Sequence, residues 1–495
     1  MNKSIQQVYL PILASFVLAV LFCLKFSITT SPFYHLHGMD SAVFHIIGKY
    51  WAQGSIPYVD LWDHKGPIIF LINCIGFLLT GGKGGVLLIQ ILSLSVFIYY
   101  TYKTFNHYLG ILPSFLLTVC GLFWLECSFL EGNLTEEYIL PFLACNFYYT
   151  LIWAEEEGQG SSDKPYPLRQ AFLLGFILAF AFLTRLTNAL GACGVAAGVA
   201  LVLMFRKQWK NLMQCIAAYL LGFILLTLPF IVYFVYHHAL NEMLFGTFFF
   251  NVSNVSVTSS NNSGLSFYFS RDKILFTIMA VNCYGLLVVS AIRFFKKKEW
   301  RINSIIWFLA TLFLGLWYLK SATMEHYRTI AVPFFPILFI SLLELKRVFL
   351  PSICVLTMVL LVTGPVLQTL RKWNSFVDYM DDTKVTGRLV QTVKDRVPEE
   401  DIHDLVLYSC PPSTWLLLDL KPIYHNFSFP ETQSYKSDKL REDIRDEYRS
   451  LKAKWVLCRG KQPLIMDILE ENYDLVYNLP GTTCRLWQLK QDAAE

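Results

Sequence analysis

Apolar segments long enough to cross a bilayer recur along the first three quarters of the chain. Each contains about 17 to 25 residues, the length that an α-helix needs to span the hydrocarbon core. Of the 495 residues, 55% are hydrophobic and only 16% are charged, and the chain contains 40 Phe. This composition is too apolar for a soluble enzyme of this size. The sequence therefore predicts a polytopic α-helical membrane protein.

We predict 11 transmembrane helices, with the N-terminus inside and the C-terminus outside. They cover residues 8–26, 86–103, 108–127, 138–153, 170–184, 188–205, 211–236, 274–294, 302–319, 329–343 and 348–369. The first segment has no small-residue cleavage site after it, so we expect it to be a retained helix and not a removed signal peptide.

The orientation follows from the distribution of basic residues. Residues 67–80 have about 14 apolar positions, which is short for a span and typical of an interfacial or re-entrant helix. If this segment does not cross the bilayer, the basic clusters 206–210, 293–301 and 346–347 all fall inside, as the positive-inside rule requires. The loop after the first span then lies on the outer face.

The composition changes to charged and polar after Leu370. Apolar runs at 404–410 and 454–459 alternate with amphipathic stretches at 385–397 and 439–451, which predicts a small extracytoplasmic α/β domain. We therefore predict a membrane domain at 1–370, with its first outer loop at 27–85, and a C-terminal domain at 371–495. Three Cys in the tail allow one disulfide if the tail is extracytoplasmic. The net charge of +4 is too small and too dispersed to imply nucleic acid.

The stretch from Gly38 to Pro67 concentrates ionisable side chains directly after the first span. Asp40, Asp60, Asp63 and Lys65 fall at the predicted membrane surface. Ionisable groups held against a bilayer are costly and normally mark a site or a pathway. An ordinary solvated loop is the alternative interpretation. The question of function therefore starts at this loop.

The order of motifs in this loop resembles the first outer loop of the GT-C superfamily of polyprenyl-phosphate-sugar-dependent glycosyltransferases. Asp40 is followed by an expected helix at 41–53, then by GSIPYVD at 54–60 and DHKGP at 63–67. The nearest branch contains protein O-mannosyltransferases and lipid A aminoarabinose transferases. Glu136-Glu137 and His326-Tyr327-Arg328 extend the likeness, which covers residues 1–370. The chain departs from the family pattern at Ser41, His64 and Gly66.

The resemblance implies a GT-C-like fold and transfer of a sugar from a polyprenyl-phosphate donor. The acceptor would be a surface glycan, a lipid or a protein on the outer face of a bacterial cytoplasmic membrane. The alternatives are a membrane polysaccharide polymerase or ligase, and a transporter or flippase for lipid-linked glycans. A transporter is expected to have charged or broken sites near the middle of its spans, whereas the ionisable residues here gather at one face.

The chemistry of the transfer assigns roles to particular residues. A base must take a proton from the acceptor, and a cation must hold the phosphate as it leaves. Asp40 is the candidate catalytic base, with a helix N-cap as the alternative. Lys65 is the candidate phosphate ligand, and the alternative is an interfacial lysine paired with Asp63. Arg328 and Arg185 are further phosphate candidates, although Arg185 also fits an interfacial anchor.

Further side chains are predicted to contact substrate. They are Tyr58, Asp60, Asp63, His64, Glu136, Glu137, His326 and Tyr327. A carboxylate at a helix N-terminus is also favoured by the dipole alone, which is the alternative for Glu136 and Glu137. Aromatic residues are enriched at membrane interfaces in any case. No cofactor is indicated with certainty. His64 and His326 could bind a divalent metal together with Asp40, but no HExxH spacing supports this, and a lone His is more often hydrogen-bonded.

Overall fold

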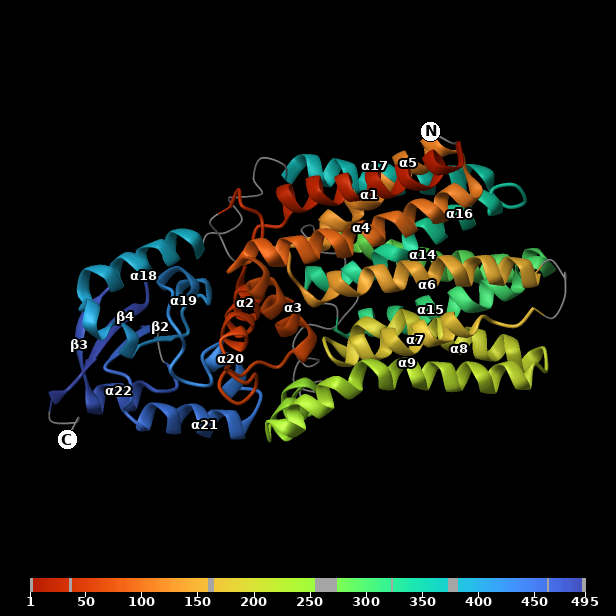
Figure 1. Ribbon diagram of the computed structural model, residues 1–495. Helices are drawn as coiled ribbons and strands as arrows, with labels where there is room; N and C mark the ends of the chain where they lie inside the picture. Colours follow the sequence, from red (N-terminus) through yellow and green to blue (C-terminus); the bar gives the residue numbers. More distant parts are fainter. Residues whose placement is uncertain are drawn as a thin grey trace. The chain divides into compact units, whose positions relative to one another are not determined.

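The computed structural model describes residues 3–34, 38–158, 164–253, 274–321, 324–372, 382–460 and 463–491. The chain forms two compact units, shown in Figure 1. Unit 1 comprises Met1–Phe33, Leu87–Val232 and Thr258–Phe376, and unit 2 comprises Tyr34–Val86, Tyr233–Val257 and Val377–Glu495. The structure thus groups the first outer loop with the C-terminal part, while the predicted domain boundary at residue 370 stays a prediction.

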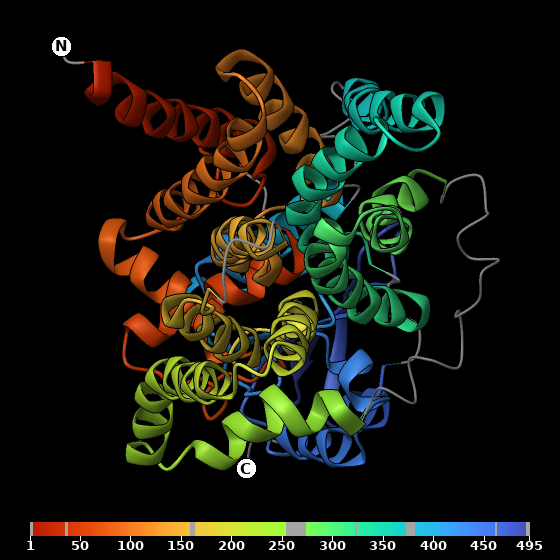
Figure 2. The same cartoon turned by 90° about the vertical axis from the view of Figure 1, so that its right-hand side faces the viewer.

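Unit 1 is a bundle of long helices, seen nearly end-on in Figure 2. Its elements are α1 (Lys3–Phe26), α4 (Lys83–Tyr108), α5 (Ile111–Phe129), α6 (Thr135–Gly158), α7 (Leu168–Phe182), η1 (Leu186–Ala189), α8 (Leu190–Phe205), α9 (Trp209–Tyr236), α14 (Ile274–Lys296), η3 (Lys298–Trp300), α15 (Arg301–Ser321), η4 (Glu325–Phe334), α16 (Phe335–Leu345) and α17 (Pro351–Lys372). In the described part of the chain, eight helices are long and apolar enough to cross a membrane. The protein is a multi-pass membrane protein, and each of the predicted spans coincides with helical segments of this bundle.

Small residues bring two helices of unit 1 into close backbone contact. A Cβ atom at Gly194 of α8 would lie 2.4 Å from the carbonyl oxygen of Leu309, and one at Gly198 would lie 2.7 Å from the Cα of Ile306. Both glycines therefore face α15, where no larger side chain fits. Such close approach is typical of helix packing in membranes, because lipid supplies no hydrophobic driving force between helices.

Unit 2 begins with a helical hairpin. Its helices are α2 (Met39–Ala52) and α3 (Pro67–Thr80), and α3 starts with a proline and ends before Gly81 at φ 71°. The 14 residues of α3 extend only about 21 Å, less than the hydrocarbon core of about 30 Å. At the contact with α2, a Cβ on Gly48 would lie 2.4 Å from the Cβ of Asn73, so glycine permits the close packing. Short segments α10 (Leu240–Leu244), η2 (Phe245–Phe249) and α11 (Phe250–Ser253) belong to the same unit.

The C-terminal part of unit 2 is an α/β fold, as the sequence predicted. Strands β1 (Leu405–Tyr408), β2 (Trp455–Arg459), β3 (Tyr473–Asn478) and β4 (Cys484–Leu489) form one sheet in the order β1-β2-β4-β3. The pair β1–β2 is parallel, and the other two pairs are antiparallel. The helical elements are α18 (Asp382–Arg396), η5 (Glu399–Asp404), α19 (Ser413–Leu418), α20 (Pro430–Ser434), α21 (Asp438–Arg449) and α22 (Met466–Asn472). The tail cysteines Cys410, Cys458 and Cys484 are buried free thiols, so the disulfide that the sequence allowed does not form.

Candidate functional site

The loop between α2 and α3 is folded around a buried tyrosine. Tyr58 has φ 69° and no exposed surface, and its ring centroid lies 5.7 Å from that of Phe70 and 5.6 Å from that of Phe234. Its hydroxyl donates to the carbonyl oxygen of Lys65 at 2.7 Å. Tyr58 is fully buried, so its predicted contact with substrate is not seen in this structure and stays a prediction. Tyr58 instead holds the backbone of Lys65.

The motif DHKGP forms a compact polar arrangement in this loop. One carboxylate oxygen of Asp63 accepts the backbone N–H of Lys65 at 2.9 Å, and the other lies 3.9 Å from His64 Nδ1. Lys65 Nζ lies 3.0 Å from His64 Nε2. Because an ammonium can only donate, His64 Nε2 is the acceptor and the imidazole is neutral with its proton on Nδ1. Burial raises the pKa of Asp63 to about 6, against the opposing charge of Lys65.

Asp40 faces this arrangement from α2. Its Oδ2 lies 3.8 Å from Lys65 Nζ, and about a third of its side chain is exposed. Asp40 is not the helix N-cap, which corrects one of the two sequence interpretations: Gly38 occupies that position, and α2 already includes Met39. Asp40 therefore lies within the first helical turn, with its carboxylate directed at a cation and open to solvent. The ammonium of Lys65 approaches Asp40 and His64, whereas the backbone N–H of Lys65 donates to Asp63.

A second lysine comes from the C-terminal α/β part of unit 2. Lys436 lies in the turn between α20 and α21 and is half-buried. Burial, followed by the like charge of Lys65, lowers the pKa of Lys436, while the carboxylates of Asp40 and Asp63 act in the opposite direction. Lys436 thus lies within electrostatic range of Lys65, Asp40 and Asp63.

Other contacts within unit 2 attach the loop to the C-terminal part. The backbone N–H of Trp62 donates to the carbonyl oxygen of His425 at 3.0 Å, and His425 Nδ1 lies 2.9 Å from the carbonyl oxygen of Val59. Lys49 of α2 pairs with Asp419. The C-terminal part therefore positions the loop that carries Asp63 and Lys65. Asp60 has a local role, since its exposed carboxylate accepts the backbone N–H of Ile56 at 2.7 Å.

The other predicted residues belong to unit 1, and three of them form a stacked ion pair. Arg185 Nη1 lies 3.0 Å from Glu136 Oε1, and the guanidinium carbon lies 3.3 Å from the ring centroid of Tyr327. The ring centroids of His326 and Tyr327 lie 4.5 Å apart. Glu136 is 1% exposed. Arg185 therefore forms a buried ion pair with Glu136, and its role as a phosphate ligand stays a prediction.

Glu137 and Arg328 are also buried in unit 1. Glu137 accepts the amide of Gln90 at 2.6 Å and the backbone N–H of Leu134 at 2.9 Å. The second contact caps the N-terminus of α6, as a glutamate at the third position of a helix commonly does. Arg328 is 1% exposed within η4. Its role as a phosphate ligand stays a prediction.

The metal site that the sequence left open has no ligand cluster in the described part of the chain. Across the described ranges, no group of three or more His, Cys, Asp or Glu side chains is arranged to hold a metal ion.

Several important residues could not be found from the sequence. Lys436 stands in an unremarkable polar turn, and Gln90 lies inside an apolar span. Asn251 donates its amide to the carbonyl oxygen of His64 at 2.9 Å although the two are far apart in the chain. These contacts depend on tertiary packing, and no spacing in the sequence signals them.

No family model matches the sequence, and no curated protein matches it. Solved structures do match. The crystal structure of ArnT from Cupriavidus metallidurans bound to undecaprenyl phosphate is 12% identical with a TM-score of 0.55, and the match covers 97% of this chain and 98% of that chain. The apo oligosaccharyltransferase of Archaeoglobus fulgidus is also 12% identical, with a TM-score of 0.49 over 97% of this chain and 74% of that chain. The match with ArnT shows the fold and confirms the GT-C-like architecture that the sequence resemblance implied.

Proposed function

We propose that this protein is a membrane glycosyltransferase that moves a sugar from a polyprenyl-phosphate donor to an acceptor hydroxyl or amine. The observation that carries the proposal is the approach of Lys65 Nζ to Asp40 Oδ2 at 3.8 Å, with the charge of Lys436 acting on the same groups. The shared fold with ArnT, whose structure holds undecaprenyl phosphate, supports a lipid-phosphate donor. The acceptor is a surface glycan, a lipid or a protein.

The charges of the site fit the bond changes of this transfer. The acceptor oxygen or nitrogen bonds to the anomeric carbon, the bond from that carbon to the phosphate oxygen breaks, and the acceptor proton passes to Asp40. The carrier phosphate begins as a singly charged diester and leaves as a monoester with more negative charge. Lys65 and Lys436 therefore stabilise charge that develops in the transition state, which is the kind of interaction that accelerates a reaction.

The remaining polar residues support this assignment. Tyr58 and Asp63 hold the backbone of Lys65, and the neutral His64 accepts from its ammonium. Of the two carboxylates around Lys65, Asp63 is buried and Asp40 is partly exposed, so an acceptor can reach Asp40. In unit 1, we assign Glu136 and Arg185 to orienting Tyr327 for contact with a sugar or carrier.

We further propose that the enzyme lies in a bacterial cytoplasmic membrane with the N-terminus inside and with Asp40 and the C-terminal part outside. All three basic clusters gather at one end of unit 1. Arg206 Nη2 donates to the carbonyl oxygen of Glu157 at 3.2 Å, η3 packs against Gly158, and Arg293 pairs with Glu344 next to Lys346. The positive-inside rule places this end in the cytoplasm.

The direct test is discharge of a labelled donor. Purified full-length protein in lipid nanodiscs is incubated with a panel of undecaprenyl-phosphate sugars, each labelled in the sugar, together with a membrane extract as a source of acceptor. We expect transfer of label from one donor to a new product, with release of undecaprenyl phosphate. Intact donors across the panel, with movement of label only between leaflets of proteoliposomes, would instead identify a flippase.

A further inference from the structure

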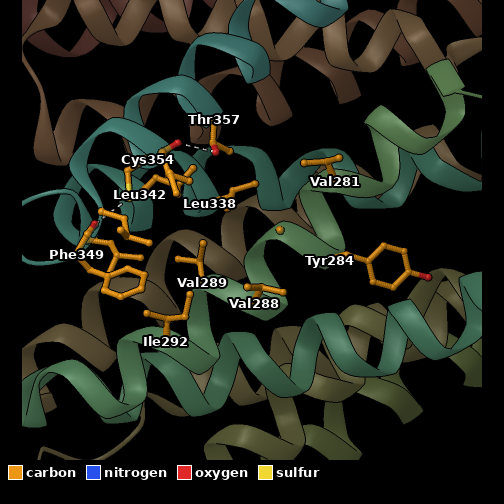
Figure 3. A pocket seen from close by; sticks show the side chains of 14 residues that line it. Val281, Tyr284, Val288, Val289, Ile292, Leu338, Leu342, Phe349, Cys354 and Thr357 are labelled. Atoms are coloured by element: carbon orange, nitrogen blue, oxygen red, sulfur yellow. Dashed lines mark hydrogen bonds between the residues drawn. The ribbon is translucent and has the colours of Figure 1, made fainter.

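An apolar groove lies between α14, α16 and α17 of unit 1, and none of its lining residues is assigned to the transfer reaction (Figure 3). Its volume is about 460 Å³, and side chains such as Val288, Leu338, Leu342 and Ile353 line it. The two hydroxyls in the lining are occupied within the protein. Tyr284 donates to the carbonyl oxygen of Gly315 at 2.9 Å, and Thr357 donates to that of Ile353 at 2.9 Å. The groove therefore offers only hydrocarbon to an occupant.

The length of the groove matches one leaflet of a bilayer. Its lining on α14 runs from Val281 to Ile292, which corresponds to about 17 Å of helix. Half of the hydrocarbon core is about 15 Å thick. Val288 and Ile353 are 56% and 57% exposed, so the groove is open to the surrounding medium, which is lipid for a helix in a membrane. An acyl chain fits this length, chemistry and access.

One end of the groove carries a cluster of cations. Lys296 Nζ lies 4.3 Å from the ring centroid of Phe349, which lines the groove, and Lys346 and Arg347 occupy the turn just before it. Among the described residues, these three side chains form no ion pair, whereas the neighbouring Arg293 is paired with Glu344. The first turn of α17 at Pro351 also presents its positive end here. A hydrocarbon groove thus ends at an unbalanced positive charge.

We propose that the groove binds an anionic glycerophospholipid of the bilayer. One acyl chain lies between α14, α16 and α17, and the headgroup phosphate contacts Lys296, Lys346 and Arg347. Basic pockets between membrane helices are suited to anionic headgroups. The site also differs from the phosphate site predicted at Arg328 of the same unit, because η4 and α16 together place Lys346 about a bilayer's thickness from Arg328.

The test compares two lipids that share their acyl chains. Delipidated full-length protein is titrated with dioleoyl phosphatidylglycerol or dioleoyl phosphatidylcholine, and retained lipid is counted by native mass spectrometry. We expect one phosphatidylglycerol per chain, bound at least about tenfold more tightly than phosphatidylcholine. Equal retention of the two lipids by the wild-type protein would overturn the proposal without any variant.

Two pairs of variants localise the binding. Lys346→Gln with Arg347→Gln should abolish the preference for phosphatidylglycerol, whereas Lys207→Gln with Lys210→Gln, which removes the same charge from another basic cluster, should keep it. Ile353→Trp should fill the groove and reduce retention, whereas Val355→Trp, exposed on the same helix outside the lining, should not. The proposed site is contradicted if the Lys346→Gln, Arg347→Gln protein still prefers phosphatidylglycerol. It is also contradicted if a variant and its control lose lipid binding equally. If one charge variant fails to fold, the tryptophan pair still decides.

Discussion

At the scale of single residues, the proposed role of Asp40 as the catalytic base can be tested directly. Asp40→Asn keeps the shape of the side chain but removes its ability to take a proton at neutral pH. We expect transfer to fall by about 10²- to 10⁴-fold with donor affinity retained, because general base catalysis contributes about that factor. Single-turnover rates and donor binding measure the two effects separately. Asp474→Asn, an exposed carboxylate on β3 of the same unit, is the matched control, and full activity of Asp40→Asn would remove Asp40 from the mechanism.

The two lysines give a prediction that distinguishes phosphate binding from structural support. Lys65→Ala and Lys436→Ala should each weaken donor affinity by about tenfold or more, since hydrogen bonds to charged groups contribute about 1.5–3 kcal/mol. Lys65→Arg should recover only part of the activity, because arginine differs in reach and geometry. Lys452→Ala, at an exposed position of the same unit, should leave affinity unchanged. Wild-type donor affinity in both alanine variants would end the phosphate assignment, and equilibrium binding of labelled donor provides the measurement.

At the scale of secondary-structure elements, α21 is coupled to the segment that reaches the loop. Glu447 accepts the backbone N–H of Asn426 at 3.2 Å, next to His425, and burial raises the pKa of Glu447 to about 7. A raised pKa in the folded state means that protonated Glu447 favours folding. Its stabilisation is therefore complete below the ordinary value near 4.5 and is lost as pH rises through about 7.

We therefore expect the segment around Asn426 to open more readily at pH 8 than at pH 6. Hydrogen exchange of the amides at 423–429, corrected for the intrinsic pH dependence of exchange, reports this opening. Glu447→Gln carries no charge at either pH and should remove the difference. The neighbouring groups that titrate or carry charge, His425 and Asp443, stay in place as the background. The same pH dependence in wild type and in Glu447→Gln would show that another group controls the segment.

At the scale of the whole molecule, the orientation of the chain can be measured directly. A membrane-impermeant maleimide applied from outside should label Gln53→Cys in the loop after α2 and Asp474→Cys in the C-terminal part, but not Lys297→Cys. The native cysteines provide a low baseline, since all 12 are buried or only partly exposed. Labelling of Lys297→Cys before membrane permeabilisation would reverse the proposed topology.

The sequence alone was enough to predict the class of protein, the positions of its apolar helices and the α/β character of the tail. Eight of these helices are long and apolar enough to cross a membrane in the described part of the chain, against 11 predicted spans. These properties depend on local patterns: runs of about 20 apolar residues, the Pro67 and Gly81 boundaries of α3, and short apolar strands between amphipathic helices. The GT-C-like fold also followed from motifs in sequence order. Asp40 and Lys65 were singled out in the same way, because they lie close together in the chain.

Only the tertiary structure decided how the candidate residues are used. It buries Tyr58 beneath Lys65, balances Arg185 with Glu136, places Gly38 and not Asp40 at the cap of α2, and brings Lys436 to the charged group from the far end of the chain. The reason is physical: burial and the pairing of charges depend on contacts between residues that are distant in sequence, and local periodicity carries no information about such contacts.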